Sequence, residues 1–202
     1  MTLTSAHFSI SLDGFMAGPD QDREHPLGLR GIELHRWHFA DDMTPADTAQ
    51  VEHLLKPRGA FVMGRNMYGP IRGEWTDEDW RGWWGDEPPY HAPVFVLTHY
   101  PHDPIEMEGG TTFHFVTDGF DAAYGQAREA AGDLDILIAG GASTIRQALE
   151  AGVIDELVLD IAPVVLGSGE SPFAGLGDRL ALEPVEASHS PYATHVRYRV
   201  GG

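Results

Sequence analysis

The strongest constraint on the fold is a stretch in the second half of the chain, where an apolar run passes through two glycines into a segment with helical spacing. Leu134–Ala139 is rich in branched aliphatic residues, which is typical of a strand buried on both faces of a sheet. Gly140 and Gly141 lack a Cβ atom, so the backbone is freer there and another group can approach it closely. Ser143 and Thr144 then begin the helix. The stretch predicts a buried strand, a glycine turn and a helix.

This turn also has the features of an anion-binding site. The first N–H groups of a helix have no partner within the helix, and the helix dipole adds positive potential at the same end. Strand, glycine turn and hydroxyl-bearing helix start together favour a phosphate cradle. The same pattern also occurs as a plain connection between a strand and a helix, so the sequence alone leaves both interpretations open.

The rest of the chain repeats the alternation of strands and helices. Strands are expected at residues 3–12, 60–63, 94–97, 112–116 and 156–166, and helices at 33–39, at 44–55 after a Thr44 cap, and from an Asp118 or Asp121 cap to 131 before Gly132. Residues 180–187 and 194–200 alternate in period two, which predicts an antiparallel hairpin. We therefore expect one α/β domain over residues 1–202, with a mixed, mainly parallel sheet, helices on both faces and a C-terminal hairpin.

The charge balance narrows the classes of partner. The chain has 31 acidic and 13 basic residues, and its formal net charge of −18 repels nucleic acid. No apolar run approaches the roughly 20 residues of a membrane helix, and the N-terminus lacks the pattern of a signal sequence. The chain has no cysteine, which excludes disulfides, thiolate nucleophiles and cysteine-bound metals. We expect a soluble cytoplasmic protein that binds neither nucleic acid nor membrane.

Several catalytic motifs are missing from the sequence. It contains no G-x-G-x-x-G after a strand, no G-K-[ST] at a helix start and no G-x-S-x-G elbow. His35 and His38 are three residues apart, but no third ligand accompanies them, so we expect no metal site. What remains is a set of polar or glycine-rich strand ends, where open α/β sheets bind their ligands. These ends are Asp13-Gly14, Gly64–Asn66, Thr98-His99 and Gly140–Ser143.

An aromatic segment stands out between two of the strands. Residues 71–92 hold Trp75, Trp80, Trp83 and Trp84 among acidic residues. They are too polar for a core and too aromatic for a linker. One interpretation is an insertion whose tryptophans pack on the domain, and the other is a cover over a ring-shaped ligand or a subunit contact.

Five segments occur in the order and spacing of a known family, namely Ser11–Gly18, Val62–Tyr68, Val96–His99, Ile138–Ala142 and Asp155–Gly167. They resemble the dihydrofolate-reductase-like fold, in the branch typified by the reductase domain of the riboflavin-biosynthesis deaminase-reductase. The resemblance covers nearly the whole chain. It implies an NADPH cofactor across the strand ends and hydride transfer to a C=N or C=O carbon of a small heterocyclic or ribosyl substrate. In the riboflavin pathway the enzyme is the 5-amino-6-(5-phosphoribosylamino)uracil reductase.

The resemblance also implies roles for individual residues. The cofactor pyrophosphate is expected at Gly140, Gly141, Ala142, Ser143 and Thr144, with Gly64, Arg65 and Asn66 on its other side. Thr98 and His99 correspond to the site of the adenosine ribose and its 2′-phosphate, and Ser9 and Met16 to backbone contacts with the nicotinamide carboxamide. On the substrate side the residues are Asp13, His35 and Trp37. Asp13 is equally a usual turn former before a glycine.

Two alternative functions stay open, and the first is a true dihydrofolate reductase. Dihydrofolate reductases carry an acid in a D-L-x-W-F pattern, and the nearest match is Glu33–Phe39, where the acid is one residue out of step with Trp37. The other alternative is a nucleotide-binding module without turnover.

The family branch further implies a homodimer, joined partly through sheet edges near the C-terminus.

Overall fold

The computed structural model describes residues 2–70, 73–76, 79–177 and 180–201. Its strands are β1 (Thr4–Ser11), β2 (Ala60–Gly64), β3 (Pro93–Leu97), β4 (Ile105–Glu106), β5 (Thr112–Val116), β6 (Ile136–Gly140), β7 (Glu156–Ala162), β8 (Ala181–His189) and β9 (Thr194–Gly201). Its helices are α1 (Pro45–Leu54), α2 (Arg65–Tyr68), α3 (Phe120–Ala131) and α4 (Ala142–Glu150), with 3-10 helices η1 (Gly31–His38) and η2 (Glu108–Gly110). No helix in these ranges is both long enough and apolar enough to cross a membrane.

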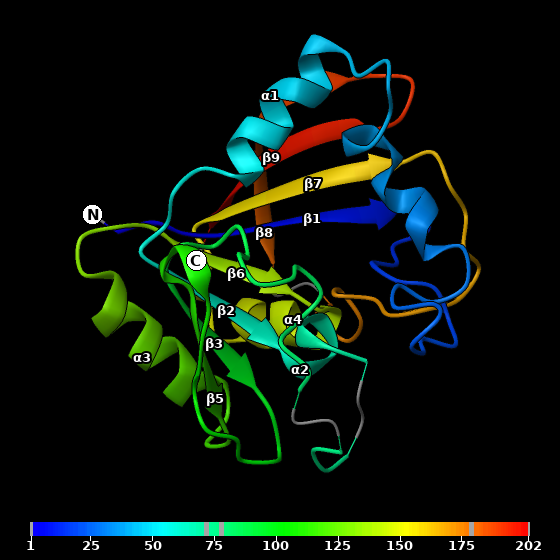
Figure 1. The fold of residues 1–202 in the computed structure, drawn as a ribbon. Helices are drawn as coiled ribbons and strands as arrows, with labels where there is room; N and C mark the ends of the chain where they lie inside the picture. The colour runs from blue at the N-terminus through cyan, green and yellow to red at the C-terminus, as the bar shows by residue number, and fades with distance from the viewer. Residues whose placement is uncertain (1, 71–72, 77–78, 178–179, 202) are drawn as a thin grey trace.

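The described strands form one nine-stranded sheet in the order β4-β5-β3-β2-β6-β1-β7-β9-β8. All neighbours from β5 to β7 run parallel, whereas β4 at one edge and the β8–β9 hairpin at the other are antiparallel. The predicted mixed, mainly parallel sheet with a C-terminal hairpin is confirmed. Because the central strands run the same way, their carboxyl ends meet at one edge of the sheet (Figure 1).

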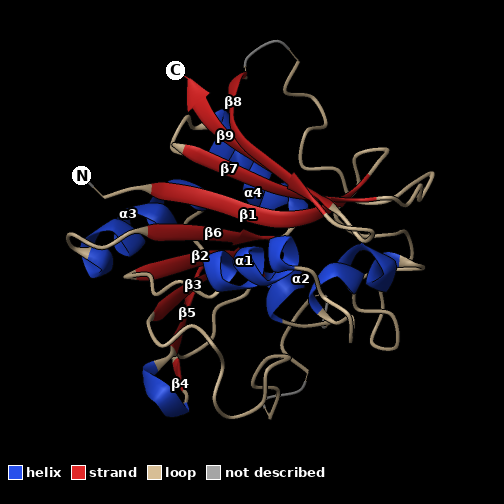
Figure 2. Ribbon diagram, turned by 90° about the horizontal axis from the view of Figure 1, so that it is seen from above, coloured by secondary structure: helices blue, strands red, loops and turns tan. Residues whose placement is uncertain are grey.

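Helices cover both faces of the sheet, as predicted (Figure 2). α3 and α4 pack on one face, over an aliphatic core that includes Ala6 and Phe8 of β1. η1, α1 and α2 lie on the other face. Successive side chains of a strand point to opposite faces, so His7 and Ser9 belong to that second face. One strand thus supplies hydrophobic core on one side and polar groups on the other.

The capping residues in the sequence predict the start of α1 correctly, but not those of α3 and α4. Thr44 caps α1 as predicted, because its hydroxyl accepts the Asp47 N–H while the Asp47 carboxylate accepts the Thr44 N–H. The predicted side-chain cap of α3 is wrong. Gly119 occupies that position without a side-chain hydrogen bond, and neither Asp118 nor Asp121 caps the helix. α4 also has a glycine, Gly141, as its N-cap, and it begins at Ala142, one residue before the predicted start at Ser143.

The main error in strand length concerns β7. The apolar run was expected to remain a strand to residue 166, but β7 ends at Ala162. Pro163 follows, and a proline has no N–H to donate to a neighbouring strand. The remainder of the run becomes a loop whose Val164 carbonyl accepts the Leu12 N–H. This loop therefore lies beside the segment that follows β1.

Candidate functional site

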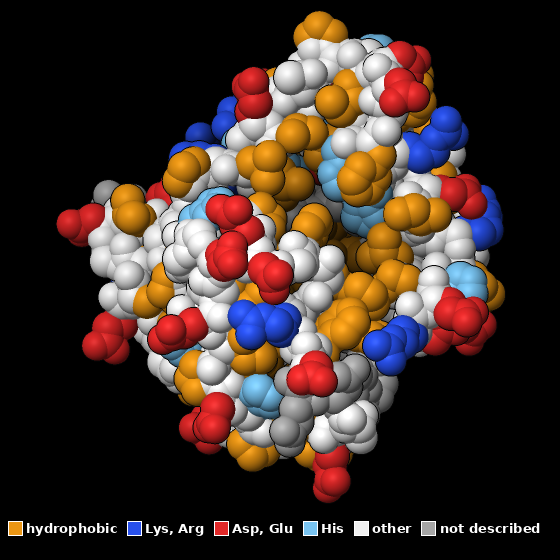
Figure 3. Space-filling model, in the orientation of Figure 1, with side chains coloured by type: hydrophobic (Ala, Val, Ile, Leu, Met, Phe, Trp, Pro, Cys, Tyr) orange, Lys and Arg blue, Asp and Glu red, His pale blue; other side chains and the backbone are white. Residues whose placement is uncertain are grey.

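A cleft of about 740 Å³ opens at the carboxyl ends of the parallel strands. It is lined from β1, β2, β3, β6, β7 and η1 and from the starts of α2 and α4. Figure 3 shows a hollow surrounded mainly by hydrophobic and histidine side chains. The predicted site residues in its lining are Ser9, Met16, His35, Trp37, Gly64, Arg65, Asn66, Thr98, His99, Gly140, Gly141, Ala142, Ser143 and Thr144. Of the predicted site residues, all of which are described, only Asp13 lies outside the lining.

The glycine turn forms one wall of the cleft. Gly141 is the N-cap of α4, and its carbonyl accepts the N–H groups of Thr144 and Ile145 at 3.0 and 3.1 Å. A Cβ atom added to Gly141 would meet no protein atom within 4 Å, so the space beside it is open. A Cβ on Gly64 would instead lie 2.6 Å from the Thr144 hydroxyl oxygen. The two strand ends therefore approach closely at Gly64, and the start of α4 offers its backbone donors to the cleft.

Arg65 lies at the same end of the cleft. Its Nη1 donates to the Thr98 hydroxyl at 3.3 Å, and its guanidinium lies 3.3 Å from the centre of the Trp75 ring. Tyr100 adds a second ring at 5.9 Å, and exposed His99 is adjacent in the chain. A guanidinium held in this way presents a fixed positive charge with planar donors, which suits a phosphate group.

The opposite end of the cleft is aromatic and rich in imidazole groups. The buried indole of Trp37 donates to the Ser9 hydroxyl at 2.9 Å, and its ring stacks with His38 at 4.6 Å between centroids. Burial lowers the pKa of His35 to about 4, helped by the charge of His38, and burial also lowers the pKa of His38. Both rings are therefore neutral near pH 7.

His35 and His38 also present unsatisfied polar atoms. The Nε2 atoms of both rings are buried and have no hydrogen-bond partner among the described residues. Both residues line the cleft. Leaving a buried polar atom unpaired costs about 1–3 kcal/mol, so a ligand that pairs with these nitrogens recovers that free energy.

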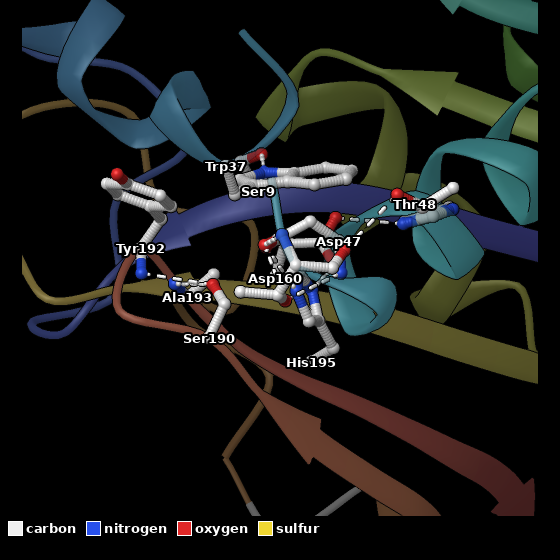
Figure 4. Close-up of polar contacts among 11 residues, drawn as sticks. Ser9, Trp37, Asp47, Thr48, Asp160, Ser190, Tyr192, Ala193 and His195 are labelled. Atoms are coloured by element: carbon white, nitrogen blue, oxygen red, sulfur yellow. Dashed lines mark hydrogen bonds and ion pairs between the residues drawn. The ribbon is translucent and has the colours of Figure 1, made fainter. Parts of the chain in front are cut away.

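A row of four buried side chains lies behind this end, and we call it the His–Asp row. Figure 4 labels three of its members, Asp47, Asp160 and His195. His7 Nε2 is 2.8 Å from Asp160 Oδ2, Asp160 Oδ1 is 2.7 Å from His195 Nδ1, and His195 Nε2 is 3.2 Å from Asp47 Oδ1. Burial raises the pKa of Asp160, but the hydrogen bonds from His195 and His7 outweigh it and lower the pKa. Asp47 has a lowered pKa as well, because hydrogen bonds from neighbours including Ser190 outweigh the effect of burial.

The row fixes the charge of His195. Carboxylates only accept hydrogen bonds, so both ring nitrogens of His195 must donate, which makes the ring an imidazolium. Burial alone would lower the pKa of His195, but Asp160 and Asp47 raise it. At the near end of the row, His7 and Asp160 line the cleft.

No motif in the sequence points to the His–Asp row as a unit. A partial signal was available, because Asp160 interrupts an otherwise apolar run in β7 and His7 lies among alternating apolar residues in β1. The register pairs Asp160 with Ser9, so His7 is its diagonal neighbour. Asp47 lies three residues after the Thr44 cap, so its place in the sequence is fully explained by the start of α1. The pairing with His195 depends on the register of β7 against β9, which one sequence does not reveal.

Asp13, predicted as a substrate anchor, is placed elsewhere. Its carboxylate accepts the Ser11 hydroxyl at 2.6 Å and the N–H groups of Leu166 and Gly167 at 3.1 and 2.6 Å. These bonds, with that of Ser11 the largest cause, hold the pKa of Asp13 at about 2. Asp13 thus joins the loop after β1 to the loop after β7, in keeping with its alternative role as a turn residue.

Each of the two interpretations of the tryptophan-rich segment applies to part of the segment. Residues 71–72 and 77–78 of the segment lie outside the described residues. Trp75 packs against Phe115 at 5.0 Å between ring centroids, and the Trp80 indole donates to the Tyr68 carbonyl at 3.1 Å. Trp83 and Trp84 line the cleft instead, and Trp84 is 52% exposed. The first two tryptophans of the segment therefore pack on the domain, and the last two line the cleft.

The sheet order, with a cleft at its carboxyl edge, defines a protein of the dihydrofolate-reductase-like class. The chain belongs to the family of the RibD C-terminal domain, whose family model matches residues 4–196. A comparison with curated protein sequences finds no match.

Solved structures share the fold at low sequence identity. A candidate riboflavin biosynthesis protein from Shewanella sp. PV-4 is 24% identical with a TM-score of 0.66, and all of both chains is covered. A pyrimidine reductase-like protein from Corynebacterium diphtheriae is 18% identical with a TM-score of 0.62, over 100% of this chain and 92% of that one. The Thermotoga maritima diaminohydroxyphosphoribosylaminopyrimidine deaminase/5-amino-6-(5-phosphoribosylamino)uracil reductase is 14% identical with a TM-score of 0.57. There, 99% of this chain is covered, but only 57% of the longer bifunctional protein.

Proposed function

We propose that the protein is an NADPH-dependent reductase that transfers hydride to a C=N or C=O carbon of a small heterocyclic or ribosyl substrate. One observation carries the proposal: a single cleft joins an anion-binding helix start and a fixed arginine at one end to an aromatic, imidazole-lined chamber at the other. This arrangement suits a long ligand with phosphates at one end and a ring at the other. Membership of the RibD C-terminal domain family supports a reductase.

The residues present fit NADPH. The start of α4 would hold the pyrophosphate, and Arg65 with Thr98 would hold the 2′-phosphate. Met16, whose Cε lies 3.6 Å from a Cβ built on Gly140, lines the cleft together with Ser9, where the nicotinamide would lie. When bound, the cofactor supplies the hydride, and the protein supplies position and electrostatics.

The chamber at the other end fits a flat heterocycle. Trp37 and His38 offer ring surfaces, and the unpaired Nε2 atoms of His35 and His38 offer hydrogen bonds to the edge of a ring. The Thermotoga protein that shares the fold is described as a deaminase/5-amino-6-(5-phosphoribosylamino)uracil reductase. We therefore place an aminopyrimidine of the riboflavin pathway first among substrates.

A folate reductase receives less support. The acid that would hold a pterin is represented only by Glu33, and its carboxylate is bound by Arg30 at 2.8 and 3.0 Å. Glu33 is also outside the cleft lining given by the described residues.

The test of the proposal is oxidation of NADPH by the purified protein. We expect turnover with 5-amino-6-(5-phosphoribosylamino)uracil and little or none with dihydrofolate. Turnover with dihydrofolate, blocked by antifolates, would replace the proposal with the folate alternative. NADPH binding without turnover on any pyrimidine or pterin would instead indicate a binding module.

A further inference from the structure

We propose that His7 is the catalytic proton donor of this reductase, that Asp160 sets its tautomer and that His53 returns the proton from solvent. The inference rests on the proposed function and adds the group that completes the hydride transfer. Three features support it: the hydrogen bonding of His7, its place in the cleft lining and its contact with a second, partly exposed histidine.

The hydrogen bond to Asp160 determines where His7 carries its first proton. The Asp160 carboxylate is ionised, and it can only accept. His7 Nε2, at 2.8 Å from Oδ2, must therefore be the donor. This leaves Nδ1 as the atom at which a further proton is gained or released. His7 belongs to the cleft lining, yet its side chain is 0% exposed, so the ring is already shielded from bulk water before any substrate binds.

The rest of the His–Asp row keeps Asp160 ionised. His195 donates to Asp160 from one nitrogen and to Asp47 from the other, as an imidazolium between two carboxylates. The row without His7 therefore has two negative charges and one positive charge. His7 Nε2 therefore donates to a row that carries one net negative charge. Other groups that face His7 are His53 from α1 and Trp37 and neutral His38 from η1.

His53 links His7 to the surface. The Nδ1 atoms of the two rings are 3.4 Å apart, and their centroids are 5.3 Å apart. The His53 side chain is 27% exposed, and its Nε2 lies 3.6 Å from Glu156 Oε1. The contact between the two rings is longer than a usual N–H···N hydrogen bond and is therefore weak, and in the proposed reaction a substrate heteroatom takes the place of His53 at His7 Nδ1. After release of product, the contact can form again and deliver a proton.

The acceptor carbon receives the hydride that bound NADPH supplies, and the π electrons of its C=N or C=O bond move to the heteroatom. That atom takes the proton from His7 Nδ1, which gives an amine or an alcohol and NADP⁺. Neutral His7 then regains a proton from solvent through His53. One hydride and one proton are consumed in each turnover.

The kinetic test compares His7→Gln and His53→Gln with wild type and with His114→Gln, a control on β5 outside the cleft lining. The probe is 5-amino-6-(5-phosphoribosylamino)uracil with NADPH. General acid catalysis contributes about 10²- to 10⁴-fold, so His7→Gln should slow the single-turnover rate by that factor, with NADPH binding within about twofold of wild type. His53→Gln should retain most of the single-turnover rate but slow steady-state turnover. An unchanged single-turnover rate in folded His7→Gln would overturn the inference and leave the reductase assignment standing.

A second measurement needs no ligand and no variant. Nitrogen–proton correlation spectra of the histidine rings in the wild-type protein should show His7 protonated at Nε2, in a slowly exchanging hydrogen bond. A proton on Nδ1 with a bare Nε2 would overturn the inference even if His7→Gln fails to fold. Absence of turnover by wild type would overturn the proposed function and, with it, the catalytic role of His7, whereas the spectrum would still report separately on the Asp160 contact.

Discussion

At the scale of single residues, we expect the proposed preference for NADPH over NADH to depend on Arg65. A 2′-phosphate adds roughly −1.5 to −2 charges near neutral pH, and a protein of net charge −18 repels it without a local cation. Thr98 and Trp75 hold the guanidinium in place. A charged hydrogen bond is worth about 1.5–3 kcal/mol, so Arg65→Ala should weaken NADPH binding roughly 10- to 100-fold and leave NADH binding nearly unchanged.

Fluorescence titration of both cofactors measures this difference, with Arg128→Ala on the outer surface of α3 as the matched control. Equal losses for NADPH and NADH would show that Arg65 supports the pyrophosphate or α2 instead.

His35 makes a residue-scale prediction about pH. Burial holds its pKa at about 4 in the folded protein, below the ordinary 6.5. Between these values the unfolded chain binds a proton that the folded protein does not, so stability falls as the pH decreases from about 6.5 to 4. The contribution is roughly 3 kcal/mol over that window, and His35→Gln should remove it. Denaturant unfolding at a series of pH values measures the slope, with exposed His189→Gln as control. An identical slope in wild type and His35→Gln would refute the assignment.

At the scale of elements, the turn between β6 and α4 is the central part of the proposed cofactor site. A Cβ on Gly141 would enter open space beside the helix start and not the protein core. Gly141→Ala should therefore leave the melting temperature within a few degrees of wild type and weaken NADPH binding at least tenfold, because the methyl group occupies the place of a phosphate oxygen. Calorimetric titration and thermal unfolding test both parts. Unchanged affinity would rule out the phosphate cradle, and loss of folding would indicate a structural role only.

The same scale shows what one sequence can and cannot predict. The strand, diglycine and helix were predictable, because the change from an apolar run to helical spacing occurs within a few residues. Thr44 was predictable as a cap because its partner, Asp47, is local. The end of β7 was misjudged, since apolar content outweighed the missing N–H of Pro163. In each of these cases the structure depends on residues that are close together in the sequence.

The site was predictable only where a motif is contiguous. Residues 140–144 and 64–66 each span the end of a strand and the start of the next helix, and the structure brings them to one cleft. The His–Asp row could not be derived in the same way, because its members come from β1, α1, β7 and β9 and meet only through sheet register. Asp13 was a plausible anchor from sequence, but the position of residues 166–167 assigns its carboxylate to two backbone N–H groups.

At the scale of the whole molecule, we propose a homodimer that uses the β8 edge of the sheet. Eight of the nine residues of β8 are exposed, including Leu182 at 37% and Val185 at 47%. Exposed strand edges with apolar side chains are usually paired or covered. Pro184 and the bulge that follows it limit continuous strand pairing, so side chains of β8 should supply part of the contact.

Light scattering should return the mass of a dimer at micromolar concentration. Leu182→Glu combined with Val185→Glu should shift it to a monomer, whereas Leu134→Glu, at an exposed position remote from β8, should not. A monomer mass for wild type would remove the proposal.

The central claim for the molecule is that NADPH binds in the cleft, with its nicotinamide at the aromatic end. Trp37, Trp83 and Trp84 line that cleft, so a bound dihydronicotinamide ring lies within range of energy transfer from tryptophan. The decisive measurement is titration with NADPH under excitation of tryptophan, following the emission of the nicotinamide. We expect saturable emission with one NADPH per chain, reversed by excess NADP⁺ and weakened in Gly141→Ala. Emission that rises linearly without saturation, or that NADP⁺ does not displace, would contradict the account.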